Sequence, residues 1–315
     1  MIVFSAKISE KHQNRLKTNF PEQKFVFCKN SEEAKNYVKD AVIYVTFGSD
    51  INESFLKEAK RLKWIQVLSA GVDELPFEIL QEKDIILTNV RGIHAIQMAE
   101  YAISMLMQVY RQGKKIIKNE ENQIWDKSVR INEITGKTMV VAGTGAIGSE
   151  VARLGKAFRM HTIGISKSGR QVEFFDENYN IDELNNVLSN ADFVISVLPS
   201  TPETQNYFTL EQFRAMANHA VFLNMGRGNA VVEEDLLTAV QQKEIAHAVL
   251  DVVKEEPLPK NHPFWTEENI TITPHISGLS PSYMKRALKI FEDNLNIDIT
   301  RNDNYINLIN LSRGY

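Results

Sequence analysis

The stretch VVAGTGAIGSEVARLGKAF (Val140–Phe158) indicates the fold of the central and larger part of the chain. The apolar Val140–Ala142 end a predicted strand, three glycines follow, and apolar residues then recur at helical spacing. In this setting Gly143 makes the tight turn, Gly145 lets a pyrophosphate approach the backbone, and Gly148 lets the helix pack on the strand. We therefore predict a dinucleotide-binding cradle at a helix N-terminus, formed by Gly143, Thr144, Gly145, Ala146, Ile147 and Gly148. A glycine-rich turn without a ligand is the alternative.

The residues after the next predicted strand, HTIGISKSGR (His161–Arg170), distinguish two forms of that cofactor. About 20 residues past the glycines, a carboxylate would accept a hydrogen bond from the ribose 2′-hydroxyl of NAD. This chain carries hydroxyls and cations there, which suit the dianionic 2′-phosphate of NADP. We expect NADPH or NADP to be preferred over NAD, with contacts from Ser166, Lys167, Ser168 and Arg170. A solvated surface turn is the alternative.

Short apolar runs alternate with helical patterns in two series along the chain. This alternation predicts parallel sheets with right-handed crossovers, and two series predict two α/β domains of the Rossmann-like or flavodoxin-like type. The first series is Ile2–Ala6, Lys24–Cys28, Val42–Thr46, Trp64–Leu68 and Ile85–Asn89. The second is Thr138–Ala142, His161–Ile165, Phe193–Val197, Ala220–Asn224, Ala248–Val252 and Ile270–Pro274.

Two helical segments set the expected domain boundaries. Ile93–Lys118 is apolar enough to form a long buried helix between the two series. Pro281–Thr300 repeats apolar residues at helical spacing after the last strand, and we expect it to return to the first domain. We therefore predict a discontinuous substrate domain (1–92 and 280–315) and a Rossmann domain (93–279) that binds NAD(P). A cleft between the two domains would hold cofactor and substrate.

Composition excludes several other classes of protein. The 315 residues are 43% hydrophobic and 24% charged, which allows a sizeable core. A net charge of −4 gives no basic field for nucleic acid or an anionic membrane. The single Cys28 excludes an intrachain disulfide, and neither an export signal nor an apolar run of membrane-spanning length is present. We expect a cytoplasmic protein without a metal site.

Several further motifs occur in an order that makes a resemblance specific. They are SAGVD (69–73), NVRGIHAIQMAEYAISMLM (89–107), LPSTPETQNYF (198–208), FLNMGRGNAVVEEDL (222–236), LDVVKEEPLPKNHPFW (250–265) and ITPHISG (272–278). With the glycine motif, they resemble the D-isomer-specific 2-hydroxyacid dehydrogenase family over nearly the whole chain. Within that family the sequence is most similar to NADPH-dependent glyoxylate/hydroxypyruvate reductases.

The resemblance implies a catalytic set of Arg227, Glu256 and His275. A guanidinium can grip a substrate carboxylate or carbonyl with paired N–H donors. A ketone that takes up hydride needs a proton, and histidine titrates near the pH at which it must deliver one. A carboxylate bonded to the other ring nitrogen fixes the ring, and this is the role implied for Glu256.

The resemblance also implies contacts around this set. Backbone amides of the SAGVD turn would bind the substrate carboxylate as an anion nest, beside Phe47 at the substrate side chain. A twofold homodimer through Ile93–Lys118 is implied as well, with Met105, Met107 and Val109 buried and Trp125 reaching across. The substrate residues are Ser69, Ala70, Gly71 and Phe47, and further cofactor contacts are Leu198, Pro199, Thr204, Met225, Gly226 and Asp251.

These observations favour an NADPH-dependent reductase of small 2-keto acids such as glyoxylate or hydroxypyruvate, giving D-2-hydroxy acids. Formate dehydrogenases lack the Glu partner of the histidine, so Glu256 speaks against them. Phosphoglycerate dehydrogenase is disfavoured because a regulatory extension is absent and because of the Ser166–Arg170 stretch. Phosphite dehydrogenases keep the Arg–Glu–His set and stay open, as does another 2-hydroxyacid dehydrogenase of this fold. A non-catalytic, dinucleotide-sensing corepressor-like protein is a further alternative that only turnover can decide.

Overall fold

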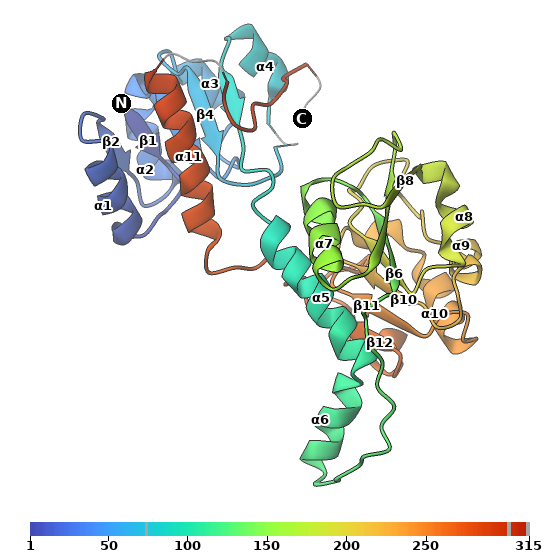
Figure 1. Cartoon of the computed structure of the whole chain (residues 1–315). Coiled ribbons are helices and arrows are strands. Elements are labelled where there is room, and N and C mark those ends of the chain that lie inside the picture. The colour runs from blue at the N-terminus through green and yellow to red at the C-terminus, as the bar shows by residue number, and fades with distance from the viewer. Residues whose placement is uncertain (73–74, 301–303, 313–315) are drawn as a thin grey trace. The chain divides into compact units, whose positions relative to one another are not determined.

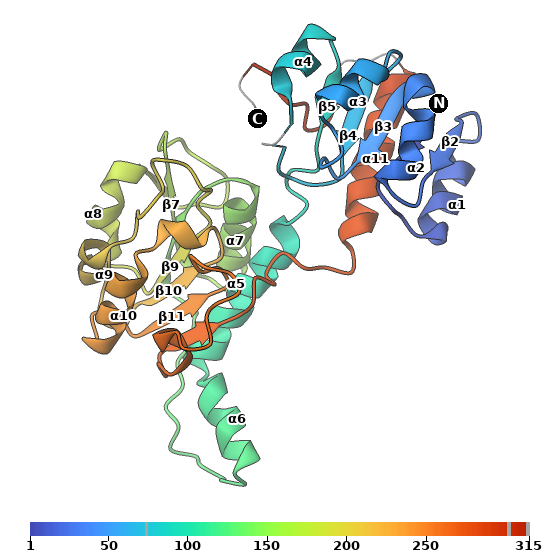
Figure 2. The same ribbon diagram turned by 180° about the vertical axis from the view of Figure 1, so that it is seen from behind.

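The computed structural model describes residues 1–72, 75–300 and 304–312 (Figures 1 and 2). The chain forms two compact units. The first consists of Met1–Ile93 and Ser280–Tyr315, and the second consists of His94–Leu279. Each unit has its own parallel sheet, so the predicted α/β class is confirmed.

The first unit is built on a five-stranded parallel sheet with the order β2-β1-β3-β4-β5. Its strands are short and mostly buried, as expected for a sheet covered on both faces. Their bounds are β1 Ile2–Phe4, β2 Phe25–Phe27, β3 Ile43–Thr46, β4 Trp64–Val67 and β5 Ile86–Thr88.

Helices cover both faces of this sheet because alternate strand residues point in opposite directions. Ile43 and Val45 pack with Phe4 and Trp64 against α1 (Glu10–Asn19) and α11 (Tyr283–Ile299). Tyr44 packs on the opposite face. That face is covered by α2 (Ser31–Ala34), the 3-10 helix η1 (Lys35–Asp40), α3 (Glu53–Glu58) and α4 (Phe77–Glu82). The views of Figures 1 and 2 both show α11 along this sheet, so the two chain segments share one core.

The second unit is built on a seven-stranded parallel sheet with the order β12-β11-β10-β9-β6-β7-β8. The chain moves outward from β6 in one direction and then from β9 in the other, so the switch point of the topology lies between these strands. The bounds are β6 Thr138–Ala142, β7 His161–Ser166, β8 Glu177–Asn180, β9 Phe193–Ser196, β10 Val221–Asn224, β11 His247–Leu250 and β12 Ile270–Ile272.

The two faces of this sheet hold separate apolar cores. Met139, Val141 and Ile195 pack on the face covered by α5 (Ala95–Tyr110) and α7 (Ala146–Ala157). Val140 and Val194 belong to the core of the other face. The elements there are η2 (Ile181–Glu183), α8 (Leu184–Leu188), α9 (Leu210–Ala215), η3 (Gly228–Ala230), α10 (Glu233–Gln241) and η4 (Pro263–Trp265).

The structure departs from the sequence-based expectation at two places in the second unit. The predicted helix Ile93–Lys118 breaks into α5 and α6 (Gly113–Glu121), because Gln112 between them has a left-handed backbone (φ 56°). The strand β8 was not predicted, since its residues Glu177–Asn180 are polar and only partly buried at the sheet edge. Figure 1 shows α6 running beyond the end of α5.

In the described ranges, no helix is both long and apolar enough to span a bilayer.

Candidate functional site

The predicted site residues of the second unit follow the carboxyl ends of adjacent strands. The register places the ends of the parallel strands side by side, at Ile165, Ala142, Ser196, Asn224, Leu250 and Ile272. The turns that follow these residues therefore emerge at one edge of the sheet. In open parallel sheets this edge, at the switch point, is where ligands bind.

The glycine turn between β6 and α7 has the geometry of an anion cradle. Gly143 has φ +108°, a conformation that a residue with a side chain rarely adopts. A Cβ on Gly148 would lie 1.9 Å from the Gly143 carbonyl oxygen, so only glycine lets α7 begin this close to the turn. A Cβ on Gly145 would meet nothing within 4 Å, which leaves open space beside the helix N-terminus. Free N–H groups of the first turn and the helix dipole suit a pyrophosphate there.

The end of β7 carries the residues predicted to select the 2′-phosphate. The hydroxyl of Ser166 is buried and has no hydrogen-bond partner among the described residues. Lys167 and Arg170 are exposed, and the Lys167 carbonyl accepts a hydrogen bond from the Asn180 amide at 2.7 Å. The Lys167 ammonium lies 3.4 Å from Glu203, a carboxylate on the loop after β9. An unpartnered hydroxyl and exposed cations fit a bound adenosine phosphate, but Glu203 adds a negative charge beside it.

The turns after β9 and β10 pack directly on each other. A Cβ on Gly226 would lie 2.6 Å from the Leu198 carbonyl oxygen, so glycine permits this contact. Leu198 and Met225, at the starts of the two turns, are both buried. The Thr204 hydroxyl donates to the Pro199 carbonyl at 2.6 Å and thereby closes the loop between these residues. Thr204 is itself buried, and its hydrogen bond holds the shape of the loop.

His275 and Glu256, the implied acid and its partner, are in contact. The His275 Nδ1 atom lies 2.8 Å from the Glu256 carboxylate, and the two side chains are 53% and 39% exposed. The other Glu256 oxygen accepts from the Val253 amide at 3.3 Å, which anchors the carboxylate to the loop after β11. Since Nδ1 is engaged, Nε2 is the ring atom available to a substrate.

Arg227 lies in the turn after β10, next to the loop that carries Glu256. Its guanidinium is exposed and donates to the Gly226 carbonyl at 2.8 Å, which leaves other N–H groups for a ligand. The buried Asn224 side chain holds this turn, because its amide donates to the Arg227 carbonyl at 3.0 Å and its oxygen accepts from the Gly226 amide at 3.2 Å. A Cβ on Gly228 would lie 2.0 Å from the Val253 carbonyl oxygen, so the turn packs tightly on the loop after β11.

Asp251, predicted as a cofactor contact, is engaged within the unit itself. It is 2% exposed, and its carboxylate accepts hydrogen bonds from Thr273, Ile276 and Ser277. These donors belong to the loop of His275. In this structure both carboxylate oxygens therefore serve the backbone around the implied acid.

In the first unit, the turn Ser69–Gly71 follows β4 and has the features of an anion nest. Its carbonyls are occupied: Ala70 accepts from the Asn89 amide at 2.6 Å, and Gly71 accepts from the Ser69 hydroxyl at 2.9 Å. In the described part of the chain, the Ala70 and Gly71 amides have no acceptor. Phe47 is exposed nearby, since its carbonyl accepts from the same Ser69 hydroxyl at 3.2 Å. Asp73, the last residue of the SAGVD motif, lies outside the described residues.

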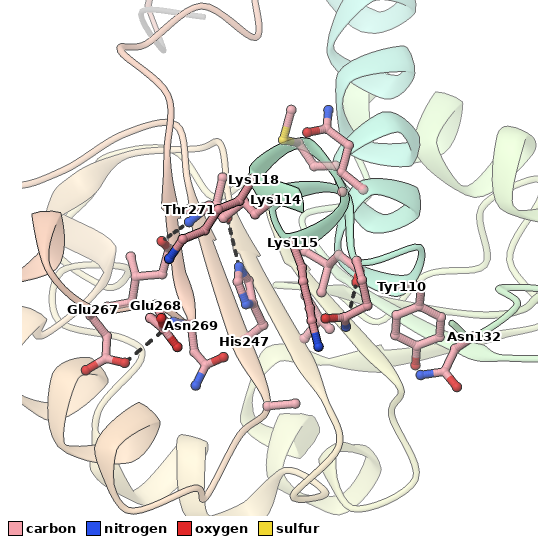
Figure 3. Close-up of a pocket in the computed structure, with 18 of the residues that line it drawn as sticks. Tyr110, Lys114, Lys115, Lys118, Asn132, His247, Glu267, Glu268, Asn269 and Thr271 are labelled. Atoms are coloured by element: carbon pink, nitrogen blue, oxygen red, sulfur yellow. Dashed lines mark hydrogen bonds between the residues drawn. The ribbon is translucent and has the colours of Figure 1, made fainter. Parts of the chain in front are cut away.

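A cavity of about 1040 Å³ lies at the opposite, amino-terminal edge of the second sheet (Figure 3). Lys114, Lys115 and Lys118 of α6 line one side of it, and His247 and Glu268 line another. Lys114 donates to the Ile270 carbonyl at 2.6 Å and thereby ties α6 to β12. Burial lowers the pKa of the neighbouring His247 to about 4. This cavity is remote in the fold from the carboxyl-end turns.

Sequence reasoning missed several residues that shape the site. Asn224 holds the turn after β10, and Asn89 holds the turn after β4. Glu203 approaches Lys167, and Tyr101 hydrogen-bonds to Thr273 at 2.7 Å. A polar residue at the end of a buried strand was the available signal for Asn224. No local signal indicates Glu203 or Tyr101, because their partners lie on other elements.

A parallel sheet with a glycine cradle at its switch point defines the class of dinucleotide-binding α/β proteins. The family described as D-isomer specific 2-hydroxyacid dehydrogenase, NAD binding domain, matches residues 103–277. The chain therefore belongs to the D-isomer specific 2-hydroxyacid dehydrogenase family, and it is an NAD(P)-dependent enzyme of that family.

Individual relatives agree with this assignment. Glyoxylate/hydroxypyruvate reductase A of Serratia proteamaculans is 31% identical over 229 residues, which are 70% of this chain and 72% of that protein. D-3-phosphoglycerate dehydrogenase of Methanocaldococcus jannaschii is 30% identical over 283 residues, 89% of this chain, but the chain spans only 54% of that protein's length. A crystal structure of a D-isomer specific 2-hydroxyacid dehydrogenase family protein from Aeromonas salmonicida is similar, with a TM-score of 0.82, 33% identity and 98% of each chain covered.

Proposed function

We propose that this chain reduces small 2-keto acids, such as glyoxylate or hydroxypyruvate, to D-2-hydroxy acids with NADPH. The observation that carries the proposal is the contact of His275 with Glu256 at the sheet edge that also bears Arg227 and the glycine cradle. The similarity to the Serratia glyoxylate/hydroxypyruvate reductase is compatible with this substrate class.

The side chains of this edge have distinct roles in the proposed reaction. NADPH held at the glycine cradle would supply the hydride that reduces the keto carbon. Arg227 binds the carboxylate or carbonyl oxygen of the substrate and stabilises negative charge as it develops on that oxygen. His275 donates the proton from Nε2, since Glu256 holds the ring at Nδ1.

We also propose that the two domains have separate roles. Residues 1–92 and 280–315 would bind the substrate, and residues 93–279 would bind NAD(P). The amides of Ala70 and Gly71 are proposed to bind the substrate carboxylate, because the carbonyls of their turn are occupied and the amides have no acceptor among the described residues. The exposed Phe47 is proposed to contact the substrate side chain.

The cofactor residues support a preference for NADPH over NADH. Lys167 and Arg170 are exposed beside the unpartnered Ser166 hydroxyl, and charge-assisted hydrogen bonds from such cations favour a 2′-phosphate. Asp251 has both oxygens engaged within the unit, and its contact with the cofactor stays a proposal.

A twofold dimer is proposed through α5 and the segment that follows α6. Met105, Met107 and Val109 are only partly buried on α5, and Trp125 is 89% exposed. Large apolar side chains left this accessible favour association with a second copy of the chain.

A steady-state screen tests the proposed reaction. Glyoxylate, hydroxypyruvate, pyruvate and bulkier keto acids are offered with NADPH and with NADH, and phosphite is offered with NADP and NAD because it requires the opposite direction. We expect the highest kcat/KM for glyoxylate or hydroxypyruvate with NADPH. Arg227→Ala should raise KM and lower kcat together, because its contact strengthens as charge develops. Turnover of phosphite alone, or of no substrate, would contradict the proposal.

A further inference from the structure

The backbone of His275 adopts a conformation that needs support. Its φ is +53°, in the left-handed region that non-glycine residues enter at a cost. His275 donates its backbone N–H to the Asp251 carbonyl at 2.9 Å and also approaches the Thr273 carbonyl at 2.9 Å. The position of the imidazole therefore depends on the strand end that carries Asp251.

The Asp251 side chain extends this support to the next two residues. One carboxylate oxygen accepts from the Ile276 amide at 2.9 Å, and the other accepts from the Ser277 amide at 2.9 Å. A single residue thus holds three successive N–H groups, from His275 to Ser277. Since Asp251 is 2% exposed, water does not compete for these bonds.

The orientation of the Asp251 carboxylate is fixed in turn by a chain of hydroxyls. The Thr273 hydroxyl lies 2.5 Å from the first Asp251 oxygen, and a carboxylate can only accept, so Thr273 donates its proton there. The Tyr101 hydroxyl lies 2.7 Å from the same Thr273 oxygen and must then be the donor of that bond. Burial raises the pKa of Tyr101, so the phenol keeps its proton at any pH at which the enzyme works.

We propose that Tyr101 is a positioning residue for His275. It acts through Thr273 and Asp251, because a donor to Thr273 strengthens the bond that Thr273 gives to the carboxylate and orients it toward the loop. These hydrogen bonds connect α5, on one face of the sheet, to the loop that follows β12. The inference rests on the proposed role of His275 as the proton donor.

Tyr101→Phe tests the proposal because it removes only the hydroxyl. Tyr110→Phe is the matched control, since Tyr110 is a buried tyrosine of the same helix whose hydroxyl has no hydrogen bond in the described part of the chain. We expect kcat to fall about fivefold in Tyr101→Phe, the change expected from one neutral hydrogen bond, with the Kd for NADPH unchanged. Tyr110→Phe should keep kcat, and Thr273→Ser should keep most of it.

A double-mutant cycle tests the route. Thr273→Val removes the link, so adding Tyr101→Phe to it should cause no further loss of kcat. Unchanged kcat in Tyr101→Phe, or equal losses in the wild-type and Thr273→Val backgrounds, would overturn the proposal.

Hydrogen exchange separates this inference from the proposed reaction. Exchange of the Ile276 and Ser277 amides should be about fivefold faster in Tyr101→Phe than in wild type or Tyr110→Phe, whether or not a substrate is turned over. Equal exchange in all three proteins would refute the positioning role. Faster exchange in a protein that turns over no keto acid would instead refute the proposed function and leave the hydrogen-bond chain in place.

Discussion

For two glycines of the cradle, Gly145 and Gly148, we expect replacement by alanine to have different effects on stability. A Cβ at Gly148 would lie 1.9 Å from the Gly143 carbonyl oxygen, so the start of α7 must move. Such overpacking costs about 1–3 kcal/mol of the free energy of unfolding, and the better helix propensity of alanine returns about 1 kcal/mol. We expect Gly148→Ala to lose up to about 2 kcal/mol of stability and to bind cofactor weakly.

Gly145→Ala adds the same methyl group where it meets nothing within 4 Å. The backbone of Gly145 (φ −73°, ψ −166°) is open to alanine, so we expect the free energy of unfolding to change by no more than about 0.5 kcal/mol. If the open space is where a pyrophosphate approaches, the methyl group must displace it. We then expect the Kd for NADPH to rise about tenfold or more, which corresponds to about 1.4 kcal/mol.

Urea unfolding and fluorescence titration with NADPH measure the two quantities on the same three proteins. The predicted pattern is lost binding at constant stability for Gly145→Ala and lost stability for Gly148→Ala. A Gly145→Ala protein that binds NADPH like wild type would refute our assignment of the cradle, whatever the result at Gly148.

Further predictions concern charge, catalysis and assembly. Arg170→Ala should lower kcat/KM for NADPH about tenfold or more, since a charge-assisted bond contributes roughly 1.5–3 kcal/mol. The kcat/KM for NADH should stay almost unchanged, and equal losses with the two cofactors would exclude a contact between Arg170 and the 2′-phosphate. Glu203→Gln should improve kcat/KM for NADPH relative to NADH, and an unchanged ratio would mean that this carboxylate does not face the phosphate. His275→Ala should cut kcat by about 10²–10⁴ while the Kd for NADPH stays constant; more than half the activity remaining would show that another group is the acid. Burial lowers the pKa of His247 from 6.5 to about 4, so below pH 6.5 the unfolded chain binds a proton that the folded protein does not. The free energy of unfolding should therefore fall by about 3 kcal/mol between pH 6.5 and pH 4. Urea unfolding should show a shallower loss for His247→Gln, and parallel curves would contradict the assignment. Light scattering at micromolar concentration should give about twice the 35.9 kDa chain mass, and Trp125→Ala should weaken the dimer; an active monomer over that range would exclude it.

The sheets could be predicted from sequence because their strands are apolar and buried on both faces. Each of the eleven predicted runs overlaps a strand, from β1 at Ile2–Phe4 to β12 at Ile270–Ile272. Strand β8 escaped prediction because an edge strand has few apolar contacts to reveal it. The break after Tyr110 escaped for a different reason, since the left-handed backbone of Gln112 has no signature in an apolar run.

A site residue could be predicted from local sequence only where its sequence neighbours determine its geometry. The glycine cradle lies within one turn, and its spacing alone carries the geometry. The contact of His275 with Glu256 joins residues 19 positions apart, and only the resemblance to a family indicated it. Tyr101 and Thr273 are 172 positions apart, and neither local spacing nor the family motifs connected them.

The pair of Lys167 and Glu203 illustrates why cofactor preference is harder to derive than cofactor class. The stretch after β7 lacks an acid, but the fold supplies Glu203 from the loop after β9, 3.4 Å from the Lys167 ammonium. Both side chains are largely exposed, so solvent screens their attraction and the contact is weak. A dianionic phosphate is the stronger partner for Lys167, and binding it requires Glu203 to turn away or to share the cation. The preference for NADPH is therefore the difference between two attractions to the same ammonium, and its size depends on a loop that lies 36 residues further along the chain.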